Sequence, residues 1–407
     1  MKHRIIAHKN AFLVVVILIL MASALTPRSF HLVGDVTLAA QRSGEYKDGE
    51  VIVQLKPGVV ARQLAARYNL TVKKDHKNNQ YLLSLTNLTA RDRLSVEQLV
   101  ARLSKDRDVE WVEPNYLVGL DQFESDQRSI PNIDPRSMPF LDGVSPADYF
   151  QQYALTLVKA PQAHAITKGF GVTVAVIDSG VDTTHPLFRN VTVGYDFVDN
   201  DTNPSETGFG SAYGHGTHAA GTVLLVAPDA TIMPIRAFNS AGIGDASAIA
   251  SAIRWAADQG AQVINMSFSY HDELRVVKDA VVYARSRGAV LVASAGNTGG
   301  AVRYPARAKE VIAVAATDAQ DRKTSWSCEG KEVHVAAPGV SIYSAYPGGG
   351  WAWWDGTSFA APLVSGEAAL IIARGRHSDV AKRIGDTADP VGGGMGKGRI
   401  NCYEAVR

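Results

Sequence analysis

Short, almost continuously apolar segments alternate with helical segments from Tyr149 to the end of the 407-residue chain. Strands of this composition are buried on both faces, which is typical of parallel sheets. Between them, residues 246–259 and 273–287 repeat apolar positions with helical periodicity. The strand segments cover residues 172–177, 263–266, 289–293 and 311–315. This alternation predicts an α/β fold with a doubly wound, mostly parallel sheet.

Polar residues follow several of these strands directly. Asp178 comes after the first strand, Ser267 after the second, and Asn297 shortly after the third. In open α/β sheets, ligands bind beyond the carboxyl ends of the strands. We therefore expect these three residues to lie at one edge of the sheet, close to a functional site.

A smaller unit precedes this region. Within residues 46–118, segments 50–55, 81–85 and 108–112 have strand patterns, and Ser95-Val96-Glu97-Gln98 is a capping box that opens a helix. The pattern predicts an α+β domain with two helices and about four strands, marginally large enough to fold as a unit. Residues 119–147 are rich in Asp and Pro and are interpreted as an exposed linker, which leaves 148–407 as the large domain.

The first 40 residues have the layout of a secretory signal peptide. Lys2, Arg4 and Lys9 precede an apolar run at 11–25 that ends in small residues. The run is shorter than the roughly 20 residues that a membrane span needs. We expect a secreted or extracytoplasmic protein, with an uncleaved N-terminal membrane anchor as the alternative.

Composition excludes other classes. The hydrophobic content of 46% is typical of a globular chain, and the net charge of +1 does not point to a nucleic-acid partner. Two cysteines, Cys328 and Cys402, are too few for a disulfide framework. A single bridge between them stays open.

Three motifs carry candidate chemistry. Asp178 lies in Val-Ile-Asp-Ser-Gly, His215 in Gly-His-Gly-Thr-His, and Ser358 in Gly-Thr-Ser-Phe-Ala-Ala-Pro. The serine precedes an apolar helix, whose N-terminus favours a developing negative charge. Taken alone, this serine motif could equally be an ordinary helix cap. A serine hydroxyl becomes a nucleophile when a base removes its proton, and neutral imidazole is a suitable base near pH 7.

The three motifs in this order resemble the subtilase family of subtilisin-like serine endopeptidases, over roughly residues 149–406. The resemblance implies hydrolysis of peptide bonds through an acyl-enzyme on Ser358, with His215 as base and acid and Asp178 orienting the imidazole. His218 and His185 are interpreted as structural. A protein or peptide is the implied substrate, a monomer the expected state, and no cofactor is required for the chemistry.

Further roles follow from the same resemblance. The side chain of Asn297 and the N–H of Ser358 would stabilise the oxyanion, and substrate would bind as an added strand between two cleft edges. Trp351, Trp353 and Trp354 would either line the leaving-group side or pack a loop. The expected substrate-binding residues are Ser267, Phe268, Ser269, Gly242, Ile243, Gly244, Ser294 and Arg303.

Arg303 falls near the floor of the primary specificity pocket in this comparison. We expect a small pocket or a preference for an acidic residue before the scissile bond. An outward-pointing arginine is the alternative. The cleft edge at Phe268 is bulkier than the family pattern and is expected to narrow the cleft.

A calcium site is a further hypothesis. Calcium prefers carboxylate and carbonyl ligands, and one acidic stretch resembles a calcium loop in thermitase-like members. Its candidate ligands are Asp196, Asp199, Asp201 and Asn203. A solvated acidic turn is the alternative.

The N-terminal unit resembles the inhibitor-like propeptide of subtilases, ending near Pro114-Asn115-Tyr116. The implied role is that of a chaperone and temporary inhibitor, with self-cleavage between about 119 and 147. A permanent accessory domain is the alternative. For the whole chain, the competing classes are a catalytically dead binding protein and an esterase that uses the same three residues.

Overall fold

The computed structural model describes residues 45–85, 95–120, 140–141 and 146–407. The proposed signal segment and most of the proposed linker therefore lie outside the described residues. In the described part, no helix has both the length and the apolar character needed to cross a membrane.

A seven-stranded sheet forms the centre of the large domain, with strand order β13-β12-β11-β10-β6-β8-β7 and parallel pairing throughout. This confirms the predicted doubly wound α/β fold. Its strands are β6 (Thr173–Asp178), β7 (Tyr195–Asp196), β8 (Thr231–Arg236), β10 (Val263–Met266), β11 (Val290–Ser294), β12 (Val311–Thr317) and β13 (Val335–Pro338).

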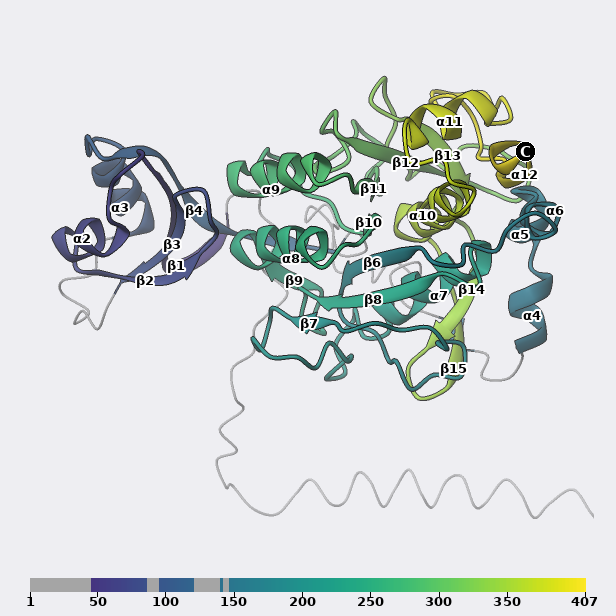
Figure 1. Ribbon diagram of the computed structural model, residues 1–407, viewed down its shortest axis with the longest axis horizontal. Helices are drawn as coiled ribbons and strands as arrows, with labels where there is room; N and C mark the ends of the chain where they lie inside the picture. Colours follow the sequence, from purple (N-terminus) through teal and green to yellow (C-terminus); the bar gives the residue numbers. More distant parts are fainter. Residues whose placement is uncertain (1–44, 86–94, 121–139, 142–145) are drawn as a thin grey trace, which may run out of the picture. The chain divides into compact units, whose positions relative to one another are not determined.

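Helices cover both faces of this sheet (Figure 1). Helices α8 (Ala246–Asp258) and α9 (Arg275–Ser286) pack on one face, and α7 (His215–Val226) and α10 (Thr357–Ala373) on the other. Each face has its own buried apolar cluster, because alternate strand residues point to opposite sides. Val174 and Val176 belong to one cluster, and Ala175 and Ile177 to the other.

Smaller elements complete this domain. A three-stranded antiparallel sheet contains β14 (Ile342–Tyr346), β15 (Gly350–Trp354) and β5 (Phe140–Leu141). The short helices are α4 (Pro146–Gln151), α5 (Tyr153–Leu157), α6 (Ala160–His164), α11 (Val380–Thr387) and α12 (Cys402–Val406).

The N-terminal unit contains the predicted two helices and four strands. They are β1 (Tyr46–Leu55), α2 (Ala61–Arg67), β2 (Leu70–Asp75), β3 (Gln80–Leu85), α3 (Val96–Leu103) and β4 (Val109–Gly119). The capping box before α3 is present with both of its hydrogen bonds. The sheet has the order β2-β3-β1-β4-β9, so that β9 (Ile243–Asp245) of the large domain is its last strand.

Helix α7 and strand β8 are among the elements of the large domain that have no counterpart in the segments expected above. Every residue of α7 is buried, which removes the amphipathic period that would indicate a helix. Strand β8 contains Pro234, a residue that argues against an inner strand. The proline is tolerated because β7 pairs only with Ile235 and Arg236, beyond it.

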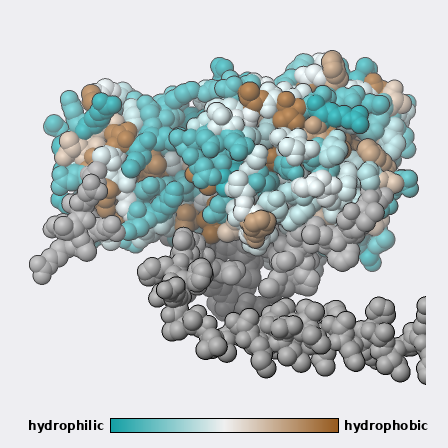
Figure 2. All heavy atoms as spheres, turned by 90° about the horizontal axis from the view of Figure 1, so that it is seen from below, coloured by the Kyte–Doolittle hydropathy of each residue, from teal (hydrophilic) through white to brown (hydrophobic). Residues whose placement is uncertain are grey.

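The two cysteines are free and buried. Cys328 belongs to the cluster beneath α8 and α9, and Cys402 to the cluster beneath α7 and α10. The possible bridge between them is therefore absent. On the face drawn in Figure 2, hydrophilic residues predominate outside the grey atoms, and apolar residues form small, separate patches.

Candidate active site

The three candidate residues come from the ends of three different elements. Asp178 ends β6, His215 is the first residue of α7, and Ser358 is the second residue of α10. All three are fully buried in this chain. The parallel sheet brings its strand ends and the following helix N-termini to one edge, as expected.

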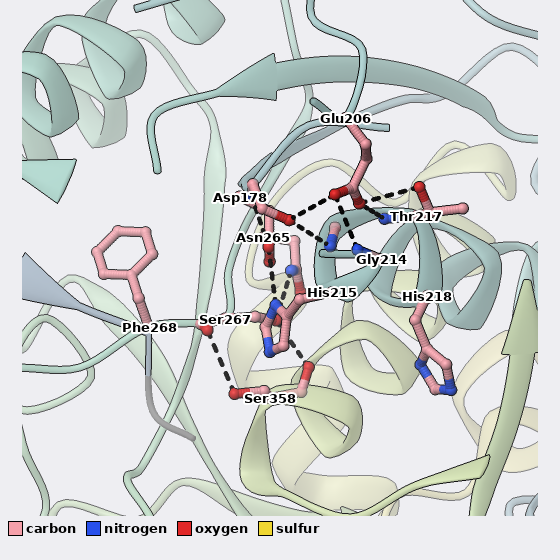
Figure 3. A network of polar contacts seen from close by, with 12 residues as sticks. Asp178, Glu206, Gly214, His215, Thr217, His218, Asn265, Ser267, Phe268 and Ser358 are labelled. Carbon is pink, nitrogen blue, oxygen red and sulfur yellow. Dashed lines mark hydrogen bonds and ion pairs between the residues drawn. The ribbon is translucent and has the colours of Figure 1, made fainter. Parts of the chain in front are cut away.

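Asp178 and His215 form a buried pair. The Nδ1 atom of His215 lies 2.7 Å from Oδ1 of Asp178, and the same oxygen accepts the N–H of Ser179 at 2.7 Å. The pairing assigns the proton of a neutral imidazole to Nδ1, which makes Nε2 the basic nitrogen. Figure 3 shows the ring of His215 between the Asp178 carboxyl and Ser358.

Two aromatic rings pack against the imidazole of His215. The ring centroids of Trp354 and Phe359 lie 5.4 and 5.1 Å from that of His215. Trp351 and Trp354 are buried, so these two tryptophans pack, which resolves one of the alternatives left open above. The contact between Trp354 and His215 has no local signal in the sequence.

A chain of hydrogen bonds anchors the serine to the end of β10. The hydroxyl of Ser358 donates to the carbonyl of Ser267 at 3.2 Å, and the Ser267 hydroxyl donates to the carbonyl of Ser358 at 2.7 Å. Asn265 donates to the Ser267 hydroxyl at 2.9 Å and accepts from Ser365 of α10 at 2.9 Å. Asn265 and Ser365 were not among the expected site residues.

Asn297 lies beside the serine with a fixed orientation. Its Oδ1 accepts the backbone N–H of Thr357 at 3.0 Å and the Thr357 hydroxyl at 2.7 Å. Since a backbone N–H can only donate, its contact assigns the two ends of the amide. The NH₂ group is consequently the end of Asn297 that can donate to a substrate oxygen.

Glu206 is a partly buried residue near His215 that the sequence did not single out. Its carboxylate accepts the N–H of Gly214 at 2.9 Å, and the N–H and hydroxyl of Thr217 at 3.0 Å each. The hydroxyl of Ser179 also donates to it, at 3.3 Å. Gly214, the N-cap residue of α7, has no side chain to cap the helix, so Glu206 supplies the cap next to His215 (Figure 3).

Replacing Glu206 with alanine should destabilise the protein by about 1–2 kcal/mol, the usual range for a lost helix cap. It should also lower kcat more than it raises KM, because His215 starts the helix that loses its cap. Glu206→Gln keeps a hydrogen-bond acceptor, so it should retain most of the stability and most of the kcat that alanine loses. Thermal unfolding and steady-state kinetics of the two variants test this, and an alanine variant with unchanged stability and kcat would contradict it.

The same carboxyl has a pH signature. Burial raises the pKa of Glu206 from 4.5 to about 7, although the N–H groups of Gly214 and Thr217 oppose the shift. The folded state then holds a proton that the unfolded state has already released. Relative to the glutamine variant, the wild type should lose stability as pH rises from about 4.5 to about 7.

The other two histidines lie in structural positions. Nε2 of His218 lies 3.0 Å from the carbonyl of Ile342, and burial lowers the pKa of His218 to about 3. Nε2 of His185 lies 2.9 Å from the carbonyl of Gly350. Both rings bind backbone carbonyls in the core, in keeping with the structural roles expected for them.

Both expected cleft edges are paired with β4 and the residue that follows it. Gly119 lies opposite Ile243 and Val118 opposite Gly244, while Leu120 forms a bridge with Phe268. The ring of Phe268 is buried against Phe238, with centroids 5.0 Å apart, and belongs to the same apolar cluster as Val118 and Leu120. That Phe268 narrows the cleft stays a prediction.

Ser294, Ser269 and Gly242, which were also expected in the cleft, lie on these edges or support them. The Ser294 hydroxyl donates to the carbonyl of Phe268 at 3.4 Å, which ties the end of β11 to one edge. Ser269 is buried on the same edge. Gly242 contributes its carbonyl oxygen, which accepts the N–H of Leu120 at 2.9 Å.

The acidic stretch proposed for calcium does not fit the ion. The guanidinium of Arg236 contacts the carboxylates of Asp196, at 2.5 Å, and Asp199. Asp201 and Asn203 bind backbone N–H groups within their own turn. Among the residues described, no group of three or more acidic, histidine or cysteine side chains could hold a metal. Arg236 already supplies the positive charge that calcium would bring.

Fold and site geometry together define a serine hydrolase with an Asp-His-Ser arrangement on a parallel α/β sheet. Comparison with known proteins agrees. The family model described as "Subtilase family" matches residues 169–394, and one described as "Fervidolysin N-terminal prodomain" matches residues 34–115. The chain belongs to the subtilase family and is a subtilisin-like serine peptidase with an N-terminal prodomain.

Three similar proteins align with between 63% and 90% of this chain. Thermitase of Thermoactinomyces vulgaris is 42% identical over 273 residues, which are 63% of this chain and 96% of thermitase. The thermophilic serine proteinase of Bacillus sp. (strain AK1) is 37% identical over 386 residues, 90% of this chain and 89% of that protein. Fervidolysin from Fervidobacterium pennivorans has a similar structure, with a TM-score of 0.72 and 27% identity over 90% of this chain and 62% of fervidolysin.

Proposed function

We propose that this peptidase is an endopeptidase made as a zymogen, which cuts itself and then other proteins through an acyl-enzyme on Ser358. The observation that carries this proposal is the buried pair of Asp178 and His215, 2.7 Å apart, beside a serine anchored by Ser267. Asp178, His215, Ser358 and Asn297 are the catalytic residues of the proposal.

The chemistry follows from these positions. His215 removes the proton of the Ser358 hydroxyl as the oxygen attacks the substrate carbonyl, and then delivers it to the leaving amine. Asp178 keeps the imidazole tautomer correct and stabilises the imidazolium. A water molecule, deprotonated by His215, then hydrolyses the ester. The N–H of Ser358 and the NH₂ of Asn297 donate to the oxyanion that forms in both steps.

A serine-directed sulfonyl fluoride tests the nucleophile. The fraction of peptidase activity lost should equal the fraction of protein that carries one covalent adduct. The masses of proteolytic fragments should place that adduct on Ser358. An adduct on another residue, or full activity with Ser358 modified, would exclude the proposed mechanism. A folded enzyme without activity on casein or peptides would favour the alternative of a binding protein.

Contacts of the N-terminal unit support its proposed role as an inhibitor. Glu113 accepts the N–H groups of Arg275 and Val276 at 3.1 and 2.9 Å, and thereby caps the N-terminus of α9. Asn115 accepts the N–H of Ser247 at 3.0 Å, at the start of α8. These contacts hold β4 beside β9 and keep the cleft occupied, so cleavage and release of the unit are needed for activity.

His76 makes this contact sensitive to pH. Its Nε2 and Nδ1 lie 2.9 and 3.2 Å from the hydroxyls of Ser247 and Ser251 on α8. Burial, together with the charges of Lys74 and Arg254, lowers the pKa of His76 from 6.5 to about 3. His76 is therefore neutral in the complex. The part of the contact's stability that depends on neutral His76 should be lost as pH falls below about 6.5.

We expect the cleaved N-terminal unit to dissociate roughly 30-fold more readily at pH 5 than at pH 8 through His76 alone. Size-exclusion chromatography and peptide turnover of the processed, unseparated protein at both pH values measure this. His76→Gln should remove this roughly 30-fold part of the pH dependence. Glu113 and Asp279 also have raised pKa values at this contact. They titrate in the wild type and in His76→Gln alike, so the difference between these two proteins reports on His76. An equal pH dependence in both proteins would contradict the expectation.

Secretion is part of the proposal because of the N-terminal signal pattern in residues 1–40. We propose protein or peptide substrates and a monomeric mature enzyme of residues near 148–407. Pairing of both cleft edges with an extended chain favours a peptidase over an esterase, since main-chain hydrogen bonds of this kind recognise peptides.

A further inference from the structure

The end of the N-terminal unit lies in the cleft in the manner of an added strand. Val118 and Gly119 pair with Gly244 and Ile243 on one edge, and the N–H of Leu120 donates to the carbonyl of Gly242 at 2.9 Å. Leu120 also forms an antiparallel bridge with Phe268 on the other edge. A chain held by both edges has the register of a bound peptide.

This register identifies the residue that a productive complex would present to the nucleophile. In antiparallel pairing, the residue of a bound peptide that follows the one opposite Phe268 falls opposite Ser267. The carbonyl of Ser267 lies 3.2 Å from the Ser358 hydroxyl, so the position opposite Ser267 is the one next to the scissile bond. In the sequence, Asp121 and then Gln122 follow Leu120.

Arg303 lies at the same part of the cleft. Its N–H donates to the carbonyl of Ala295 at 3.0 Å, and the next residue, Tyr304, pairs with Tyr270 at the end of the Ser267 edge. Its aliphatic stem covers Gly296, where an added Cβ would lie 3.1 Å from Cδ of Arg303. The guanidinium Nε donates to the hydroxyl of Thr298 at 3.4 Å.

These contacts put a permanent positive charge beside the turn that presents Asn297. The backbone of Arg303 and Tyr304 connects the turn at Ala295 to the end of the edge at Ser267, so a substrate side chain opposite Ser267 would lie near Arg303. A guanidinium binds a carboxylate with two parallel hydrogen bonds, whereas it binds a neutral amide more weakly. The acidic residue at 121 has the complementary charge.

We propose that Arg303 makes the enzyme prefer Asp or Glu immediately before the scissile bond, and that the first bond cut is its own Asp121–Gln122 bond. The inference rests on the proposed function. Ser358 Oγ bonds to the carbonyl carbon of Asp121, and His215 transfers the serine proton to the Gln122 amine as the peptide bond breaks. Water then adds its hydroxide to the acyl carbon and its proton, through His215, to Ser358.

The first test is the site of self-cleavage. Mass spectra taken early in processing should show an N-terminal fragment that ends at Asp121 and a larger one that begins at Gln122. Asp121→Glu should process at a similar rate. Asp121→Asn should slow this cut by roughly 10- to 100-fold, because asparagine keeps the shape of the aspartate side chain but lacks its negative charge. An earliest cut elsewhere in the wild type overturns the assignment.

The second test uses the mature enzyme and peptides that share the Val-Gly-Leu sequence before a varied residue. Peptides with Asp or Glu should have kcat/KM values roughly 10- to 100-fold above those with Asn or Gln, and the ratio should fall with added salt. Arg303→Gln should bring the ratio close to one, Arg303→Lys should keep part of it, and Arg303→Glu should favour lysine.

Arg307 provides a matched control. It is exposed, and its guanidinium stacks on the ring of Tyr304, with the charge 5.6 Å from the ring centroid. Arg307→Gln should leave the preference unchanged. Equal turnover of acidic and amide peptides, or a preference that survives in Arg303→Gln, overturns the inference while leaving the peptidase mechanism intact. Failure to cleave any peptide counts against the proposed function itself.

Discussion

Replacing Ser358 with alanine is expected to leave the full-length chain uncut and without measurable peptidase activity. The variant loses the only atom that the proposed mechanism uses to form the acyl-enzyme, while Asp178, His215 and Asn297 remain. In subtilisin, a member of this family, loss of the equivalent group lowers kcat by about 2 × 10⁶. That value is carried over from subtilisin and is not independent of the family assignment.

Intact mass after expression gives the result directly. The wild type should lose the N-terminal unit, and Ser358→Ala should retain it. Ser286→Ala is the matched control, because this exposed hydroxyl on α9 binds only the carbonyl of Tyr283 in the described part of the chain. Processing of Ser358→Ala in a purified sample would exclude self-cleavage. An unprocessed but active wild type would instead make the N-terminal unit a permanent domain.

Replacing Asn297 with alanine is expected to lower kcat by about 10²–10³, or about 2.7–4 kcal/mol, with little change in KM. This range was measured for an oxyanion donor in subtilisin itself. The physical reason is that the donor stabilises charge that develops only in the transition state. Steady-state kinetics on one peptide substrate separate kcat from KM.

Asn297 also anchors Thr357, so alanine removes two roles at once. Asn297→Asp separates them, because a carboxylate still accepts from Thr357 but cannot donate to the oxyanion. It should therefore keep the thermal midpoint near that of the wild type and lose at least as much kcat as alanine. If Asn297→Asp retained wild-type kcat, Asn297 would be a structural residue and not an oxyanion donor.

Much of the fold could be predicted because its signals are local. The strand predicted at 263–266 coincides with β10, and the helices predicted at 246–259 and 273–287 differ from α8 and α9 by one or two residues at their ends. Chain segments buried on both faces are almost entirely apolar, so these strands can be recognised from their own residues. Helix α7 was missed for the same reason, since complete burial leaves no polar face to mark its period.

The acidic stretch at 196–203 shows the limit of reading a site from composition. Its residues suit calcium, but the contact from Arg236, which comes from β8, neutralises two of them. No pattern in residues 196–203 indicates that arginine. Such a partner is found only when the sheet brings the end of β8 beside β7.

Local patterns predict the class of fold, a division into two parts, and the three motifs with Asp178, His215 and Ser358, because each depends on residues adjacent in the chain. The contacts that support those motifs, and the segment that reaches them, are visible only in the folded protein. Glu206 caps the helix of His215, Trp354 packs on its ring, and Leu120 sets the register in the cleft. These contacts join residues far apart in sequence, where loop lengths and sheet order, and not local patterns, determine which side chains meet.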